Sequence, residues 1–318
     1  MVETTKPQGA PERAAANPRG ANLRGIGWML LSGFLFVAVT GIVRHLGTDM
    51  SPMQAAFIRY AFGLVLMTPL LLRLGGGAGL FSEGRAHRRT ASRRLALHAL
   101  RGLIHGFGVM LWFYAMARIP IAEVTALGFT APIFTTLGAV LFLGERLHAR
   151  RIGAVLVAFG GAMIILRPGF QEISVGALAQ LTAAPLFAVS FLITKKLTET
   201  ETSPSIVAYL SIFVTLALLP GAIMAWRTPT WEELGWLFLT AVFATLMHLA
   251  MTQAFRCAEI SVVQPFTFLQ LIWATLLGYY VFAERPEIWI WIGGAVIVGS
   301  ASYIARREVL ARRSRRER

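Results

Sequence analysis

The sequence reads Trp112-Phe113-Tyr114-Ala115-Met116-Ala117-Arg118 and, 139 residues later, Met251-Thr252-Gln253-Ala254-Phe255-Arg256. At this constant offset the identical pairs are Ala115 and Ala254, Phe129 and Phe268, Glu145 and Glu284, and Gly160 and Gly299. Both stretches lie inside long apolar segments. The repetition indicates that the chain consists of two similar halves.

The composition is that of a membrane protein. Apolar residues make up 56% of the 318 residues and charged residues 14%, whereas about 25% of the residues of soluble proteins are charged. About 20 consecutive apolar residues cross a bilayer as a helix, because backbone polar groups in lipid must be satisfied within the segment. No segment alternates as a barrel strand would. Ten segments qualify as helices, at residues 26–46, 53–73, 95–117, 121–143, 150–167, 175–195, 204–226, 234–255, 260–282 and 288–305.

The positive charges are distributed as in a protein of the inner (plasma) membrane. If both termini are cytoplasmic, the cytoplasmic segments hold 23 of the 30 lysines and arginines and the opposite loops hold five. This asymmetry follows the positive-inside rule. Because it accounts for the net charge of +14, we do not expect nucleic-acid binding. The basic cytoplasmic tail, residues 307–318, is expected to contact anionic lipids.

The repeat divides the chain into two units of five helices. We expect a disordered cytoplasmic tail at 1–25, a first repeat at 26–168 and a second repeat at 174–306. Because five is an odd number, the second repeat begins on the opposite side of the membrane. The predicted fold is therefore an all-α membrane protein with ten transmembrane helices as two inverted five-helix repeats, a plan that is common among secondary transporters.

Short motifs recur in a specific order. In the first half they are Tyr114-Ala115-Met116-Ala117, Ala122, Pro132, Gly144-Glu145, Gly153, Gly160-Gly161 and Arg167-Pro168-Gly169. In the second half they are Ala254, Gln264-Pro265, Glu284, Gly293-Gly294 and Gly299. In these motifs and their order the chain resembles the EamA family of the drug/metabolite transporter superfamily.

This resemblance implies a carrier of small polar metabolites, often amino acids or their derivatives. It also implies a central cavity lined by the first, third, fourth, sixth, eighth and ninth helices. The second half departs from the family pattern at two positions, where Leu271 aligns with Pro132 and Ala283 aligns with Gly144.

Signatures of enzymes and of bound cofactors are missing from the sequence. There is no His-Glu-x-x-His, Gly-x-Ser-x-Gly or Gly-x-x-x-x-Gly-Lys motif. The six histidines lack the spacing of metal ligands, and Cys257 is the single cysteine. We therefore expect neither an enzyme nor a metal or cofactor site.

Polar and aromatic residues at mid-depth are the candidates for a substrate site, because ionisable groups inside a membrane usually face the bundle interior. His105 and His248 are predicted near the midplane, where each either contacts substrate or protons or is a neutral, structural imidazole. Pro132, Pro185 and Pro265 interrupt helices beside hydroxyls and amides that suit a polar ligand. The candidate cavity residues are His105, Trp112, Tyr114, Phe129, Thr130, Gln180, Ser190, His248, Gln253, Gln264, Gln270 and Trp273.

Two arginines inside helices are candidates for gating charges. Buried charges are generally paired; Arg59 is expected near Glu123 and Glu284 toward the outer face, and Arg101 near Glu145 toward the inner face. The alternative is that each arginine extends to the membrane interface, which is favoured for Arg101. The motif Gly102-x-x-x-Gly106 predicts close helix packing.

We predict a secondary active transporter of a small polar metabolite that works by alternating access, with proton coupling or exchange. The alternatives are a membrane-embedded enzyme acting on lipid-linked substrates and a non-transporting receptor or assembly subunit. The expected partners are a small-molecule substrate and membrane lipids, and a homodimer is left open. A midplane with Arg59 and no evident acidic residue favours neutral, zwitterionic or anionic ligands.

Overall fold

The described part of the chain is helical. The computed structural model describes residues 18–73, 85–131, 134, 149–167, 172–258, 263, 266–267 and 269–316, and no strand occurs among them. Every predicted membrane segment overlaps one of the described helices, which confirms the fold class. These helices are α1 (Pro18–Leu46), α2 (Pro52–Arg73), α3 (Arg85–Met116), α4 (Ile121–Gly128), α6 (Ala149–Leu166), α7 (Val175–Leu197), α8 (Ser203–Met224), α9 (Trp231–Cys257), α11 (Leu269–Phe282) and α12 (Ile288–Arg316).

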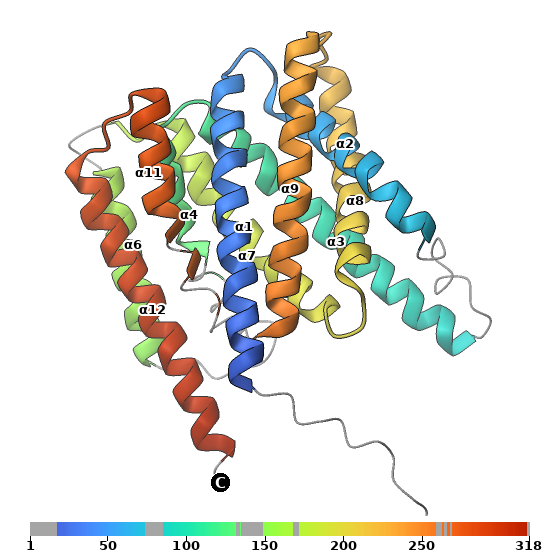
Figure 1. Cartoon of the computed structure of the whole chain (residues 1–318). Helices are drawn as coiled ribbons and strands as arrows, with labels where there is room; N and C mark the ends of the chain where they lie inside the picture. The colour runs from blue at the N-terminus through green and yellow to red at the C-terminus, as the bar shows by residue number, and fades with distance from the viewer. Residues whose placement is uncertain are drawn as a thin grey trace, which may run out of the picture.

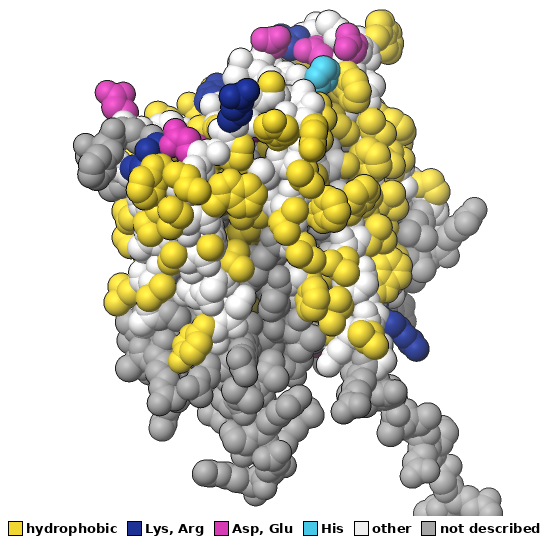
Figure 2. Space-filling view, turned by 60° about the vertical axis from the view of Figure 1, so that its left-hand side comes forward, with side chains coloured by type: hydrophobic (Ala, Val, Ile, Leu, Met, Phe, Trp, Pro, Cys, Tyr) yellow, Lys and Arg dark blue, Asp and Glu magenta, His cyan; other side chains and the backbone are white. Residues whose placement is uncertain are grey.

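The surface of the bundle is that of a membrane protein. Among the described residues, five helices are long and apolar enough to cross a bilayer, and the segments Leu269–Phe282 and Ile288–Ser300 are shorter apolar helices. Large apolar side chains such as Phe34, Val65 and Leu216 are exposed. Figure 2 shows apolar side chains over the sides of the molecule and most of the coloured charged side chains gathered at one end.

The helices pair according to the inverted repeat. In the second half α7, α8, α9, α11 and α12 correspond to α1, α2, α3, α4 and α6 of the first half. Helix α1 packs along α9, and its counterpart α7 packs along α3. Helix α2 packs on its own counterpart α8, α4 on α11, and α6 on α12 (Figure 1). A two-fold operation that exchanges the halves therefore preserves every one of these pairs.

The first and last described residues lie at the same end of the bundle. Helix α1 begins and α12 ends there (Figure 1), and we call it the terminal end; the other is the distal end. Distal charges form pairs, Arg167 with Glu287 and Arg227 with Glu233. The hydrogen bonds that Arg227 donates to the Glu233 carboxylate raise the pKa of Arg227 above its ordinary value. Helix α9 begins distally with a capping box in which Thr230 and Glu233 bond each other's backbone amides.

Helices α1 and α12 are longer than the apolar segments within them. Helix α1 begins at Pro18, within the segment 1–25 that was expected to be a tail. Helix α12 continues to Arg316, within the expected tail 307–318. Arginine and alanine are good helix formers, and proline is favoured in a first helical turn. These helices therefore continue beyond the apolar stretch.

Glycines allow the closest helix contacts. A Cβ atom on Gly161 of α6 would lie 2.9 Å from the carbonyl oxygen of Gly293 in α12, and one on Gly293 would lie 2.5 Å from the carbonyl oxygen of Gly161. A Cβ atom on Gly102 of α3 would lie 2.2 Å from Cβ of Phe213 in α8. The packing role predicted for Gly102 is confirmed.

Candidate substrate cavity

A cavity of about 170 Å³ lies in the centre of the bundle. Helices α1, α3, α4, α7, α9 and α11 all contribute to it, which are the six helices that the family resemblance implied. Helix α2 contributes as well, through Arg59 and Tyr60, and was not anticipated. The cavity therefore lies between the two halves and receives side chains from both.

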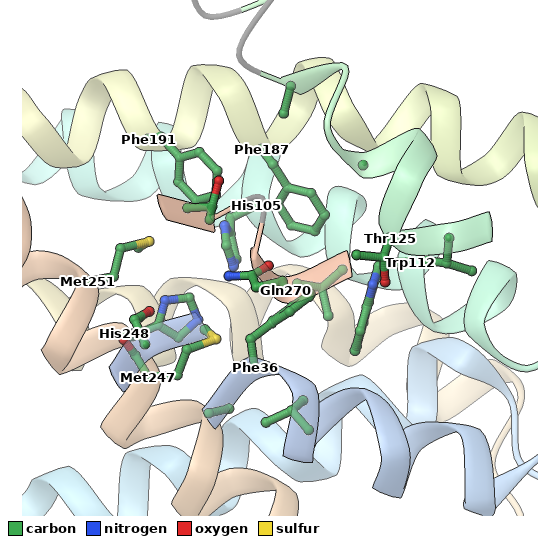
Figure 3. Close-up of a pocket in the computed structure, with 18 of the residues that line it drawn as sticks. Phe36, His105, Trp112, Thr125, Phe187, Phe191, Met247, His248, Met251 and Gln270 are labelled. Atoms are coloured by element: carbon green, nitrogen blue, oxygen red, sulfur yellow. Dashed lines mark hydrogen bonds between the residues drawn. The ribbon is translucent and has the colours of Figure 1, made fainter. Parts of the chain in front are cut away.

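Two histidines meet in this cavity. The His105 Nδ1 atom lies 3.0 Å from Ser190 Oγ, and the His105 and His248 ring centroids are 5.3 Å apart. Both side chains are buried and line the cavity, and Figure 3 shows them facing the same space from α3 and α9. His105 thus has the hydroxyl partner expected of a structural imidazole, whereas His248 Nδ1 has no partner among the described residues.

Aromatic side chains form much of the wall. Phe36 and Trp112 have ring centroids 5.5 Å apart. The ring centroid of Phe187 lies 5.2 Å from that of His105 and 6.3 Å from that of Phe191. Phe129 lines the cavity beside them. Rings packed in offset and edge-on arrangements present large apolar faces. This wall is suited to a flat, unsaturated ligand.

Two glutamine amides provide hydrogen-bonding groups. Gln180 of α7 is buried, and its Oε1 atom has no partner among the described residues. Gln270 of α11 also lines the cavity and projects into its middle in Figure 3. A Cβ atom on Gly33 would lie 3.1 Å from Gln270 Nε2, so the missing side chain on α1 makes room for this amide. Both amides are placed to recognise polar edges of a ligand.

Several predicted cavity residues lie elsewhere. Tyr114 is covered by the Arg118 guanidinium, whose carbon lies 3.7 Å from the ring centroid. Thr130 is buried and donates its hydroxyl to the carbonyl of Leu127. Gln253 is half-buried but outside the lining, and Ser190 is reached only through His105.

Trp273 is 50% exposed on the outer surface of α11, and its prediction as a lining residue is wrong. The face of α11 that packs inward carries Leu271 and Ala274, which leaves Trp273 on the apolar surface of the bundle. The depth of a residue along a helix does not specify which way its side chain faces. Gln264 lies outside the described residues, as does Glu145.

The expected partners of Arg59 and the expected exposure of Arg101 are both wrong. Arg59 lines the cavity, and its guanidinium carbon lies 3.6 Å from the Tyr60 ring centroid. Glu123 is half-buried on α4 and forms no ion pair with it. Arg101 is 1% exposed and donates to the carbonyl of Ile206 at 3.0 Å. It cannot extend to the interface, because the glycine at 102 lets α8 approach α3 closely.

Glu284 belongs to a different contact at the distal end. Its carboxylate pairs with Arg44 at 2.9 Å and accepts the backbone amide of Ile121, also at 2.9 Å. Ile121 is the first residue of α4, where free amides and the helix dipole favour a negative charge. Arg44 also donates to the carbonyl of Met116. This link, which we call the distal lock, joins α1, α3, α4 and the end of α11.

A bundle of two inverted helical repeats around a buried, mostly apolar cavity with a few polar groups is the arrangement of a membrane carrier. The chain belongs to the EamA-like transporter family, whose model matches residues 23–167 and 174–306. The family resemblance is thereby confirmed, and the chain is a transporter and not an enzyme.

Individual relatives cover nearly the full chain. A riboflavin transporter of Vibrio cholerae is 32% identical and covers 93% of this chain and 97% of its own. An S-adenosylmethionine uptake transporter of Rickettsia bellii is 29% identical, with 88% and 92% covered. A crystal structure with 18% identity covers 89% of this chain and 97% of its own, and matches it with a TM-score of 0.57. That structural likeness concerns the fold alone.

Proposed function

We propose that this protein is a secondary active transporter that binds a small polar metabolite in the central cavity and moves it by alternating access. The observation that carries the proposal is a set of buried polar atoms at the cavity that have no hydrogen-bond partner among the described residues: Arg59 Nε, Tyr60 Oη, Gln180 Oε1 and His248 Nδ1. Leaving one such group unsatisfied costs about 1–3 kcal/mol. A bound polar ligand would satisfy these atoms, which supports a ligand site.

The ligand that best fits is a planar heterocycle with polar edges. The aromatic wall accepts a flat ring, and the glutamine amides face the space that such a ring would occupy. A flavin has this chemistry, and riboflavin is the substrate named for the Vibrio cholerae relative. A sulfonium such as S-adenosylmethionine fits less well, because Arg59 is positive and no described lining residue is acidic.

The direction of the chain in the membrane follows from its charges. The positive-inside rule puts the terminal end in the cytoplasm and the distal end outside. In the described conformation the distal lock ties α1, α3, α4 and α11 together. Opening of the cavity to the outside would then require Arg44 and Glu284 to separate. His105 and His248, whose rings lie next to each other in the cavity, are the groups that would carry a coupled proton.

Transport by purified protein in proteoliposomes tests this function. Radiolabelled riboflavin is offered first, followed by uracil, nicotinamide, amino acids and S-adenosylmethionine, each with and without a pH gradient and with unlabelled compound inside. Saturable uptake is expected for at least one heterocycle, and His248→Gln should reduce it. Lack of uptake or exchange of every compound overturns the proposal and favours a non-transporting receptor.

A further inference from the structure

Arg59 is a buried cation whose charge is not matched by an acidic side chain among the described residues. It is 5% exposed, lines the cavity and has a partnerless Nε atom among the described residues. The ion pairs of the described chain are Arg44 with Glu284, His98 with Glu201, Arg167 with Glu287, and Arg227 with Glu233. None of them includes Arg59.

A purely structural role accounts poorly for this arginine. Removing a charge from water costs several kcal/mol, and an uncompensated buried charge is strongly destabilising. Arg101, the other buried arginine of the described chain, donates Nη1 to a backbone carbonyl, has Nε and Nη2 without partners among the described residues, and does not line the cavity. Arg59 instead has the Tyr60 ring on one side and the cavity on the other. A negatively charged group that enters the cavity could therefore pair with the Arg59 guanidinium.

The groups beside Arg59 are also suited to an anion. Tyr60 is buried, and its hydroxyl interacts with the Arg59 guanidinium but forms no well-aligned hydrogen bond with any described residue. Its ring centroid lies 6.3 Å from that of His105, which lies 5.3 Å from that of His248. A phenol and an imidazole N–H can both donate to an acidic group. Arg59, Tyr60 and His248 are therefore three potential donors that line the same cavity.

We propose that Arg59 and Tyr60 form an anion subsite within the cavity, and that the preferred ligand is an aromatic compound bearing a carboxylate or a phosphate. This inference rests on the proposed transport function and narrows its substrate class. Charge-assisted hydrogen bonds are worth about 1.5–3 kcal/mol, so an acid should bind at least about tenfold more tightly than its neutral counterpart.

Matched ligand pairs test the subsite. Orotate is compared with uracil, nicotinate with nicotinamide, and flavin mononucleotide with riboflavin, so that the carboxylate and phosphate arms are separate. Affinities are measured by thermal shift of the detergent-purified protein and by competition in proteoliposomes. The variants are Arg59→Gln, Arg59→Lys and, as control, Arg118→Gln at the distal end.

At least one acid should bind wild type and Arg118→Gln about tenfold more tightly than its neutral mate. In Arg59→Gln this preference should vanish while the neutral compound binds as before, and Arg59→Lys should keep part of it. Because the substitution removes an unpaired charge, Arg59→Gln should melt no lower than wild type.

Equal binding of every acid and its neutral mate by wild type overturns the inference, as does equal loss of both ligands in Arg59→Gln. Uptake of a neutral compound without any preference for its acid contradicts the anion subsite but is consistent with the proposed transport function. Acid-selective thermal shifts without any uptake do the reverse: they support the subsite and overturn the transport proposal.

Discussion

Arg44 and Lys195 make the same contact at opposite ends of the bundle. Near the end of α1, Arg44 donates to the carbonyl of Met116 at 3.1 Å. Near the end of α7, Lys195 donates to the carbonyl of Phe255 at 2.6 Å. Met116 and Phe255 are 139 residues apart, which is the offset of the sequence repeat. The inverted symmetry thus extends from whole helices to single hydrogen bonds.

The distal lock should be measurable as an energetic coupling. Arg44 and Glu284 are 23% and 10% exposed, so their coupling should be about 1 kcal/mol, between exposed and buried pairs. A double-mutant cycle of Arg44→Gln and Glu284→Gln, read as free energy of unfolding in detergent, measures it. Arg285→Gln is the control and should not couple to Arg44→Gln. Additive losses from the first two substitutions would show that the pair contributes nothing.

Replacing Ala283 by glycine should stabilise the protein. Ala283 follows the last residue of α11 with a φ of +52°, which an L side chain adopts at a cost and glycine does not. The first half has Gly144 at the equivalent position. Ala283→Gly should add about 0.5–1 kcal/mol, seen as a higher melting temperature. The control, Ala274→Gly within α11, should lower it; stabilisation by both would contradict the backbone explanation.

Two consecutive glycines of α6 should respond in opposite ways to alanine. At Gly161 an added Cβ would lie 2.8 Å from Ile297 and 2.9 Å from a backbone oxygen of α12, whereas at Gly160 nothing lies within 4 Å. Gly161→Ala should cost about 1–3 kcal/mol through overpacking. Gly160→Ala should be neutral or slightly stabilising. Melting temperatures of the two variants decide the matter, and equal values would refute the tight contact of α6 with α12.

Two residues of α11 should differ in their effect on ligand binding. Gln270 lines the cavity, while Trp273 is exposed on the outside. Gln270→Ala should weaken binding of the transported heterocycle about five- to tenfold, the value of one hydrogen bond. Trp273→Ala should leave affinity unchanged. Competition assays in proteoliposomes provide the readout; a larger effect of Trp273→Ala would mean that the cavity wall is assigned wrongly.

The single cysteine reports the orientation of the chain. Cys257 is half-buried at the terminal end of α9, and the proposed topology puts this end in the cytoplasm. A membrane-impermeant maleimide should label it in inside-out vesicles and not in intact cells. In a Cys257→Ser background, Trp231→Cys at the opposite end of the same helix, 90% exposed in the wild type, should show the reverse pattern. Exchanged patterns would invert the proposed topology.

The fold was predictable because it depends on properties summed over long segments. A wrong assignment of a few residues changes neither the number of apolar segments of bilayer length nor the constant offset of the repeat. The positions of His105 and His248 were predictable for a related reason: a polar side chain within an apolar helix has few places to go other than the interior. Their contact brings residues of opposite halves together, although the two do not align in the repeat.

The direction in which a side chain of an apolar helix points was not predictable from the sequence. Interior and lipid are both apolar, so the faces of α11 that carry Gln270 and Trp273 have almost no contrast in hydropathy. The same holds for Tyr114 and Gln253, which aligned well but lie outside the lining. The pairing of Arg44 with Glu284 joins residues 240 positions apart, and no local pattern signals which of several distal arginines reaches the carboxylate.

The pairing of helices across the two halves has a consequence for the origin of the molecule. Helices α1 with α9, α3 with α7, α2 with α8 and α6 with α12 each combine one helix from either half. Neither half encloses a core by itself. A chain of half the length, inserted in both directions, would rebuild this architecture as an antiparallel homodimer of identical copies. Fusion into one chain ensures the correct stoichiometry and allows the two halves to diverge. An example is His105 of the first half, which aligns with Ala244 in the second half.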